Sequence, residues 1–187
     1  MRLTISGKMI IPLVVAVIAT VSYLSYAEVH KEYYRNGQLQ VEETLKQGKR
    51  DGVTKFYYEN GQPRAEKNFK KGMQVGMERN YYEGGELMGE YNFENDKQHG
   101  VSKEYYKNGH LRLEGNFKDG EPEGVTKEYY EDGNIWAEMD FNNGKLNGVS
   151  KEYHKNGNIK HLDTYKDGQL VDRKVYDETG KLEPGKN

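Results

Sequence analysis

The feature that most constrains the fold of this chain is a 24-residue period that runs through most of its length. Glycines that follow Asn, Gly or Asp recur at Gly37, Gly61, Gly85, Gly109, Gly133 and Gly157. A second series at the same spacing comprises Gly48, Gly72, Asp96, Gly120, Gly144 and Gly168. A third comprises Gly52, Gly76, Gly100, Gly124, Gly148 and Asp172. Three independent marks with one period indicate a repeat protein, in which each unit packs mainly on its neighbours.

The composition argues against a thick hydrophobic core. Of the 187 residues, 34% are hydrophobic and 31% are charged, and the aromatic content is mainly 16 Tyr and 5 Phe. A thin, elongated structure fits these values, whereas disordered chains are poor in aromatic residues. The net charge of −2 gives no electrostatic case for binding nucleic acid or an anionic membrane. The absence of Cys excludes disulfides, thiolate metal sites and Cys nucleophiles.

The first 27 residues differ from the rest of the chain. Arg2 and Lys8 precede a charge-free stretch, residues 9–24, and Ser25 and Ala27 place small residues at a cleavage site. This layout predicts a secretory signal peptide over residues 1–27, cleaved after Ala27, with the repeat domain over residues 28–187. The mature protein would then be secreted or lie in the cell envelope. The alternative is an uncleaved membrane anchor over residues 9–24, although at ~1.5 Å per residue this stretch falls short of a ~30 Å hydrocarbon core.

Each repeat unit reads as a β-hairpin. In the central unit, two alternating runs, residues 101–106 and 111–117, flank Asn108-Gly109, which favours a type I′ turn. A longer connection, residues 118–123, leads to the next unit. No segment of the mature chain has a sustained helical period. Six hairpins and a degenerate tail, residues 172–187, predict about 12–13 strands. An all-β antiparallel sheet of this size would be roughly 60 Å long.

Charge pairing predicts the register of the hairpins. If residues pair symmetrically about the turn, Lys103 lies opposite Glu114. The same arithmetic pairs Lys31 with Glu42, Lys55 with Glu66, Arg79 with Glu90, and Lys127 with Glu138. Opposite charges at directly facing positions stabilise a sheet, so five such pairs support this register. The series ends where Lys151 meets Leu162.

This register assigns side chains to two faces. One face would pair the second tyrosines, such as Tyr106, with aliphatic residues such as Leu111. The same face would place an aromatic ring over each strand glycine, as Phe117 over Gly100. The opposite face would carry the charge pairs and the first tyrosines. Those tyrosines would lie across from the variable positions Arg64, Met88, Arg112 and Trp136.

The repeated pattern resembles a known family. Units of the form Gly-Val-x-Lys-Glu-Tyr-Tyr-x-Asn-Gly-x-Leu, then Phe, then Asp-Gly-x-x-x-Gly resemble MORN repeats, and more closely the bacterial variant found in YwqK-family antitoxins. The resemblance covers Tyr33 to about Gln169. It implies an elongated, single-layer, twisted antiparallel sheet of tandem 24-residue hairpins.

The same resemblance implies an antitoxin or immunity-type protein that binds a cognate toxin. Two other functions stay open: a surface or secreted host-interaction factor, and a membrane-associated scaffold like the eukaryotic MORN proteins. An export-type N-terminus differs from that of a cytosolic antitoxin. Membrane contact is expected only through this N-terminal segment.

No catalytic or metal-binding motif is evident. The five His residues lack metal-ligand spacing, and Asp119-Gly120 and Asn143-Gly144 supply too few carboxylates for calcium. Thr54, Ser102 and Thr126 occupy one repeat position and are expected to be exposed strand residues. We therefore expect a non-enzymatic protein without a metal or cofactor.

The predicted binding surface is an aromatic and cationic face that contacts another protein, either a cognate toxin or a host surface protein. Tyr, Trp and Arg are the residue types enriched at protein interfaces. An equally strong interpretation is that these residues only stiffen an exposed sheet through cross-strand pairs. The predicted partner-binding residues are Tyr57, Arg64, Tyr81, Tyr105, Arg112, Tyr129 and Trp136.

Overall fold

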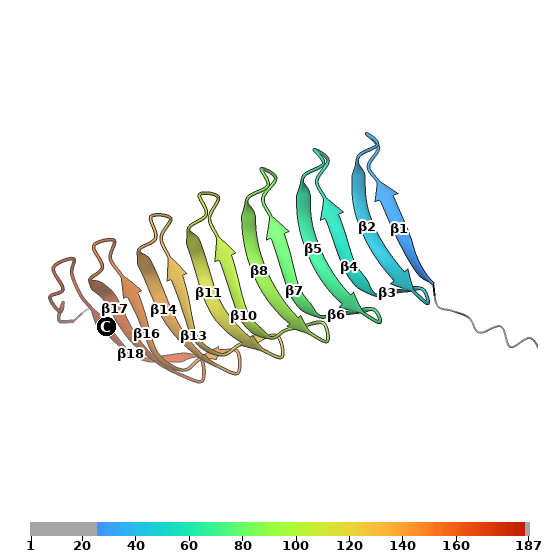
Figure 1. Ribbon diagram of the computed structural model, residues 1–187. Helices are drawn as coiled ribbons and strands as arrows, with labels where there is room; N and C mark the ends of the chain where they lie inside the picture. The colour runs from blue at the N-terminus through green and yellow to red at the C-terminus, as the bar shows by residue number, and fades with distance from the viewer. Residues whose placement is uncertain (1–25, 186–187) are drawn as a thin grey trace, which may run out of the picture.

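The computed structural model describes residues 26–185 as one continuous antiparallel sheet without a helix (Figure 1). The long strands are β1 (Ala27–Tyr33), β2 (Leu39–Lys46), β4 (Gly52–Tyr57), β5 (Pro63–Lys70), β7 (Gly76–Tyr81), β8 (Leu87–Glu94), β10 (Gly100–Tyr105), β11 (Leu111–Lys118), β13 (Gly124–Tyr129), β14 (Ile135–Asn142), β16 (Gly148–Tyr153), β17 (Ile159–Lys166) and β18 (Gln169–Val175). Short strands extend five of the hairpins: β3 (Lys49–Arg50), β6 (Met73–Gln74), β9 (Lys97–Gln98), β12 (Glu121–Pro122) and β15 (Lys145–Leu146).

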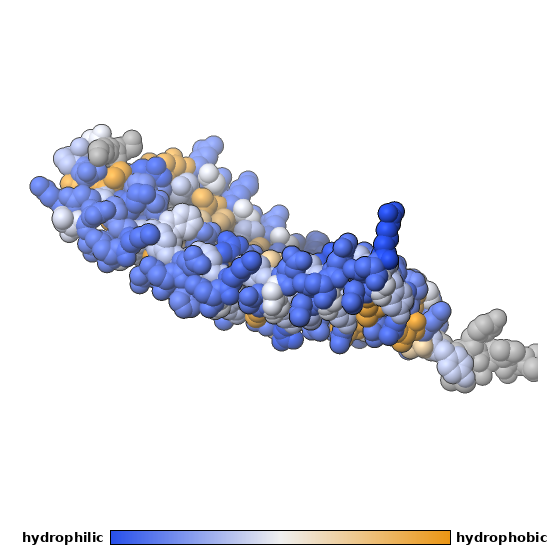
Figure 2. Space-filling view, turned by 90° about the horizontal axis from the view of Figure 1, so that it is seen from above, coloured by the Kyte–Doolittle hydropathy of each residue, from blue (hydrophilic) through white to orange (hydrophobic). Residues whose placement is uncertain are grey.

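Consecutive long strands pair with one another from β1 to β18, so the chain runs as a simple meander. The molecule is elongated, and the side seen in Figure 2 is largely hydrophilic. The predicted all-β repeat sheet is confirmed. The sheet has 18 strands, and its 13 long strands agree with the predicted 12–13, whereas the five short strands were not expected. The predicted signal peptide lies outside the described residues except for its last two positions, and β1 begins at Ala27. Within residues 26–185 no helix is long and apolar enough to cross a membrane.

The two ends of each hairpin carry different turns, and the prediction assigned them the wrong way round. At Asn108-Gly109 only the glycine has a positive φ, 85°, and Gly109 N–H donates to the Tyr106 carbonyl at 2.9 Å. This is a three-residue loop built on a type I turn, not a type I′ turn. The type I′ turn lies at the other end, where Asp119 and Gly120 have φ values of 54° and 92°. It joins Lys118 directly to Glu121, where a longer connection was expected.

A β-bulge follows every three-residue loop and restores the symmetric register. In the central hairpin, Tyr105 pairs with Leu111, but the next pair is Glu104 with Leu113, so Arg112 is an extra residue. The loop and the bulge each shift the pairing by one residue, and the two shifts cancel. Lys103 therefore pairs with Glu114 as predicted, whereas the predicted pairing of Tyr106 with Leu111 is wrong.

One face of the sheet, which we call the ladder face, carries the predicted charge pairs. Each Glu also pairs with the cation of the following hairpin, as Glu114 does with Lys127. The result is one uninterrupted row of alternating charge, with nitrogen–oxygen distances of 3.0–4.0 Å in its ion pairs. The row ends as predicted, where Lys151 pairs with Leu162. It comprises Lys31, Glu42, Lys55, Glu66, Arg79, Glu90, Lys103, Glu114, Lys127, Glu138 and Lys151.

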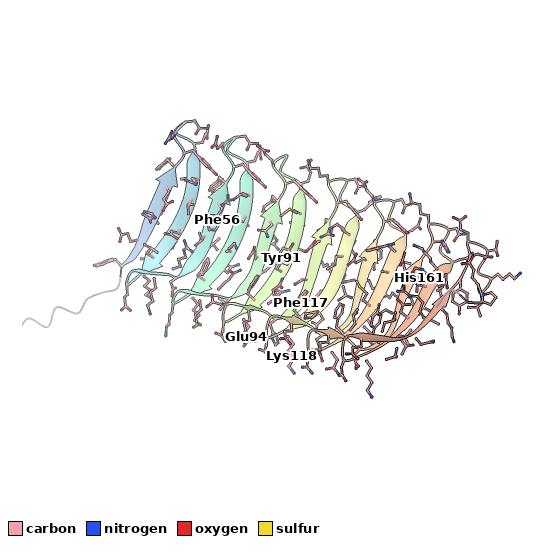
Figure 3. The ribbon with its side chains drawn as sticks, turned by 180° about the vertical axis from the view of Figure 1, so that it is seen from behind. Phe56, Tyr91, Glu94, Phe117, Lys118 and His161 are labelled. Carbon is pink, nitrogen blue, oxygen red and sulfur yellow. The ribbon has the colours of Figure 1, made fainter. Side chains whose placement is uncertain are left out.

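The opposite face, which we call the hydroxyl face, is the more buried one. Thr54 and Ser102 are 1% exposed, and Thr126 and Ser150 are also buried, so the expectation of exposed strand hydroxyls is wrong. Their hydroxyl oxygens have no hydrogen-bond partner in the described structure. Phe56, Tyr91, Phe117 and His161 mark this face along the sheet (Figure 3). Alternation along a strand separates the two faces.

The strand glycines are required by the backbone and not by an aromatic ring. Gly100 has a φ of 92°, and a Cβ added there would lie 3.8 Å from Asn92 Cβ, with no aromatic atom within 4 Å. The predicted cover of Gly100 by Phe117 is therefore wrong, although the two residues pair. A ring does cover a glycine within β8, where the Tyr91 ring fills the Cβ position of Gly89.

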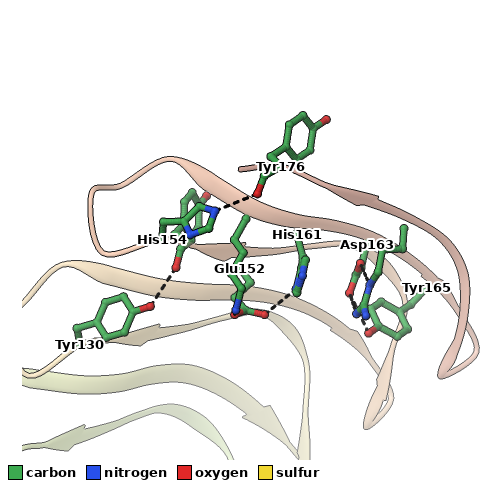
Figure 4. Close-up of polar contacts among 10 residues, drawn as sticks. Tyr130, Glu152, His154, His161, Asp163, Tyr165 and Tyr176 are labelled. Atoms are coloured by element: carbon green, nitrogen blue, oxygen red, sulfur yellow. Dashed lines mark hydrogen bonds and ion pairs between the residues drawn. The ribbon is translucent and has the colours of Figure 1, made fainter. Parts of the chain in front are cut away.

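The second tyrosine of each pair joins one hairpin to the next. Tyr106 Oη donates to the Tyr129 carbonyl at 2.7 Å, and four other hairpins repeat this bond at 2.7–3.0 Å. His154 takes the tyrosine position in the last hairpin, and its Nε2 bonds to the Tyr176 carbonyl at 3.0 Å (Figure 4). The only buried hydrophobic residues in the described part of the chain are Val41, Ala65 and Ala137. Contacts between neighbouring repeats therefore replace a central core.

Candidate binding surface

The extra residue of each bulge lies on the hydroxyl face and forms what we call the bulge row. Three contacts fix the face: Arg112 forms an ion pair with Glu104, Lys160 Nζ lies 2.6 Å from Glu152, and the Arg64 guanidinium lies 5.5 Å from the Phe56 ring centre. Bulges commonly redirect a side chain in this way. The bulge row comprises Gln40, Arg64, Met88, Arg112, Trp136 and Lys160.

The bulge separates the predicted site residues into two groups. Arg64, Arg112 and Trp136 belong to the bulge row, whereas the four tyrosines lie on the ladder face. The prediction placed all seven together because it counted residues symmetrically from the turn and omitted the extra residue. Tyr57, Tyr81, Tyr105 and Tyr129 instead pair with Pro63, Leu87, Leu111 and Ile135. A partner-binding role for either group stays a prediction.

The ladder-face tyrosines contact the carboxylates of the ladder. Tyr153 Oη donates to Glu138 at 3.0 Å, and Tyr105 Oη lies 3.5 Å from Glu90. Burial and the hydrogen bond to Glu138 raise the pKa of Tyr153 to about 12. These hydroxyls are therefore engaged with groups of the same face.

Each bulge residue has a cross-strand neighbour on the first strand of its hairpin, and the two can form a charge pair. In the fourth hairpin Arg112 pairs with Glu104. In the sixth, Glu152 accepts from Lys160 at 2.6 Å and from His161 at 2.9 Å (Figure 4). Burial opposes the ionisation of Glu152, but these hydrogen bonds outweigh it and lower the pKa of the carboxyl. Both hairpins thus contain a complete pair.

Three other hairpins contain only half of this pair. In the first, Glu32 occupies the acid position and Gln40 the cation position. In the second, Phe56 occupies the acid position, and Arg64 stacks on its ring without an ion pair among the described residues. In the fifth, Trp136 occupies the cation position opposite Glu128. Glu128 has no ion pair with a described residue, its carboxylate accepts no hydrogen bond from one, and burial raises its pKa.

Shallow hollows lie beside Arg64 of the second hairpin and beside Trp136 of the fifth, and Glu128 lines neither of them. One, of about 430 Å³, is lined by Phe56, Arg64 and Met88 among others, and a second, of about 190 Å³, lies beside Trp136 and Glu152. A hollow on the ladder face is lined by charges that already pair with each other. Within residues 26–185 no three His, Asp or Glu side chains gather as a metal site requires. The hydroxyl face can therefore offer grooves and unpaired charges to a ligand.

Sequence alone could not place the bulge row, because the hairpin register is the same with or without the paired irregularities. One available signal was variation, because residue type changes from hairpin to hairpin at this position. The signal is not unique to it, since the position three residues further on, also on the hydroxyl face, holds Glu43, Lys67, Tyr91, Gly115, Met139 and Asp163. The family model described as MORN repeat variant matches residues 29–47, 50–71, 74–95, 98–119, 122–143 and 146–167. Together these segments cover more than half of the chain. No curated protein matches it.

Proposed function

Because the chain belongs to the MORN repeat variant family, we propose that it is a non-enzymatic protein-binding module whose partner lies along the bulge row. One observation carries this proposal. The charge ladder, the tyrosine pairs and the turn glycines repeat from hairpin to hairpin, whereas the bulge row presents Gln, Arg, Met, Arg, Trp and Lys in succession. A constant scaffold that displays a variable row is the arrangement by which repeat proteins bind extended partners.

The physical roles of the second tyrosines and of the ladder charges explain why these two rows vary little. The second tyrosines supply hydrogen bonds between hairpins, and the ladder charges each face opposite charges on both sides. The bulge residue is not required for these hydrogen bonds or charge pairs, because it is outside the regular cross-strand pairing. Arg and Trp are also the residue types that most often dominate binding energy at interfaces. The bulge row is therefore free to encode recognition.

For the partner itself, we propose a protein met outside the cytoplasm, either a cognate toxin or a host surface protein. The charge-free N-terminal stretch and the resemblance to YwqK-family antitoxins support this choice. Fractionation of producing cells with an intact-mass measurement tests the compartment. The expected result is a protein outside the cytoplasm whose intact mass corresponds to a chain that starts at Glu28. An uncleaved chain in the membrane would instead make the segment an anchor.

Site-specific photo-crosslinking in the producing cells tests the binding face. A photoreactive residue replaces Arg112 or Trp136 on the bulge row, and Lys103 or Val125 on the ladder face serves as the matched control. We expect one discrete protein adduct from the bulge-row positions only. Adducts confined to the ladder-face positions would contradict the proposal, as would the absence of any protein adduct.

A further inference from the structure

Three carboxylates form a row on the hydroxyl face in the C-terminal half of the sheet. Leu113 pairs with Glu104 on one side and with Glu128 on the other. Ala137 in turn pairs with Glu128 and Glu152. The three acids therefore recur on every second strand, roughly 10 Å apart. They project from one scaffold into equivalent surroundings.

The chain supplies cations for only two of these three acids. Arg112 binds Glu104, and Lys160 with His161 binds Glu152. Arg112 also attracts Glu128 electrostatically, but burial outweighs this attraction and the pKa of Glu128 is raised. The position that holds Arg112 in the fourth hairpin and Lys160 in the sixth holds Trp136 in the fifth. Glu128 is therefore left without the cation that its two equivalents have.

Trp136 adds a second group suited to the missing cation. Its side chain is 37% exposed, so its ring is accessible, and its indole N–H has no acceptor among the described residues. The face of an indole ring attracts cations more strongly than that of any other aromatic side chain. Trp136 lies beside Ala137, which pairs directly with Glu128. The register thus places the residue that carries the π surface diagonally across from the residue that carries the acceptor carboxylate, both on the hydroxyl face.

We infer that Glu128 and Trp136 form a binding site for a cationic side chain, an Arg guanidinium or a Lys ammonium, that the protein partner supplies. The inference rests on the proposed function, since it names the chemistry of one contact on the bulge row. The partner's cation takes the place that Arg112 occupies in the fourth hairpin. It hydrogen-bonds the Glu128 carboxylate and lies against the indole ring.

The chemistry favours an organic cation over a metal ion or an anion. A single carboxylate with an aromatic neighbour lacks the several oxygen ligands that Mg²⁺ or Ca²⁺ requires. An anion would be repelled by Glu128 and by the neighbouring Glu152. A guanidinium or ammonium group satisfies both the carboxylate and the ring. Its binding also removes the cost of a half-buried acid without a partner.

The test uses the indole N–H resonance of the full-length protein, because Trp136 is the only Trp in the chain. The probes are N-acetyl-arginine amide and N-acetyl-lysine amide, with the neutral N-acetyl-citrulline amide as an isosteric control. We expect a saturable shift of the indole resonance with at least one of the two cationic probes, and none with citrulline. An equal shift with citrulline, or no saturable shift with any probe, would overturn the inference.

Two variants make the test specific for the carboxylate. Glu128→Gln should weaken binding by about tenfold or more, as expected for the loss of a charge-assisted hydrogen bond. The matched control Glu114→Gln alters a ladder-face acid that Lys103 already neutralises, and it should leave the indole titration unchanged. Unaltered binding by Glu128→Gln, in a variant whose amide spectrum shows the native fold, would also overturn the inference.

The outcomes separate this inference from the proposed function. If crosslinks form at the bulge row but the indole titration fails, the module binds a protein through other contacts and the cation site is wrong. If the titration succeeds but no bulge-row crosslink forms, the cation site exists and the protein-binding function is wrong. Trp136→Arg supplies a further check, followed by the Glu128 backbone amide resonance because this variant has no indole. An internal cation should abolish the shift that the cationic probes cause at this amide.

Discussion

The two faces of this sheet are built by the same hairpins, yet they differ in how completely their side chains pair. On the ladder face every charge from Glu42 to Glu138 has an opposite charge on both sides. On the hydroxyl face the corresponding pairs are complete in some hairpins and half-empty in others. The difference teaches that strict repetition holds the sheet together, whereas departures from it leave groups free for a partner.

The ladder face is poorly suited to recognition for an energetic reason. Its charges alternate in sign, so their fields cancel over a few strands and offer little long-range attraction. Each exposed ion pair contributes only about 0.2–1 kcal/mol, and a partner would have to displace it. On the hydroxyl face, Glu128 and Arg64 have no such pair to lose.

The largest expected difference in stability is between two variants that each introduce a Glu, one on each face. Ser102→Glu should cost about 3 kcal/mol of stability, because the carboxylate would be buried without a cation. Glu78 is tolerated at the equivalent position because Lys67, Gln74 and Asn80 bind it at 2.5–3.2 Å. Urea unfolding at neutral pH, followed by circular dichroism, measures the loss.

The matched control is Val101→Glu, one residue away on the ladder face. Val101 is 46% exposed, so a carboxylate there keeps its hydration and should cost under about 1 kcal/mol. Similar losses for the two variants would show that the faces do not differ in burial as described.

The two tyrosine rows offer a comparison of intermediate size. Tyr106→Phe removes the hydrogen bond to the Tyr129 carbonyl and should cost about 1 kcal/mol. Tyr105→Phe removes only a 3.5 Å contact with Glu90 on the ladder face and should cost a few tenths of that. Thermal unfolding of both variants measures the difference. A larger loss for Tyr105→Phe would contradict the assignment of hairpin-joining bonds to the second tyrosines.

The smallest expected effect is a pH dependence of opposite sign for two acids of the fifth hairpin. Burial raises the pKa of Glu128 on the hydroxyl face above its usual 4.5. Burial also opposes ionisation of Glu138 on the ladder face, but hydrogen bonds from Tyr153 and Lys151 outweigh it and lower that pKa. Ionised Glu128 therefore costs stability, and ionised Glu138 contributes stability.

Glu128→Gln should consequently be more stable than the parent at pH 7, with an advantage that fades as the pH falls through the raised pKa to below 4.5. Glu138→Gln should be less stable at pH 7, and its deficit should fade as the pH falls through the lowered pKa. Both differences should be under about 1 kcal/mol, as for other partly exposed charges. Urea midpoints measured from pH 3 to pH 8 would contradict this if both variants shifted in the same direction.

Much of the fold follows from the sequence by itself. The 24-residue period, the hairpins and the strand number are local properties of turn residues and alternating runs. The charge ladder could also be predicted, down to its end at Lys151 and Leu162, because opposite charges must face one another wherever the register holds. The register shifts of the loop and of the bulge cancel. The residue pairs predicted for the strands beyond the bulge are therefore correct, even though the turn type was predicted wrongly.

The candidate site depended on the tertiary structure. Side chains alternate between faces with a period of two, so one extra residue in a strand changes the face of everything between it and the turn. The bulge therefore moved Arg64, Arg112 and Trp136 away from the tyrosines to the face of Glu128. No local sequence pattern marks the bulge, because the bulge is set by the backbone pairing between the two strands of a hairpin. The 24-residue period in the sequence determined that the chain forms a repeat sheet. The bulges, which only the tertiary structure shows, determined which side chains lie on the same face.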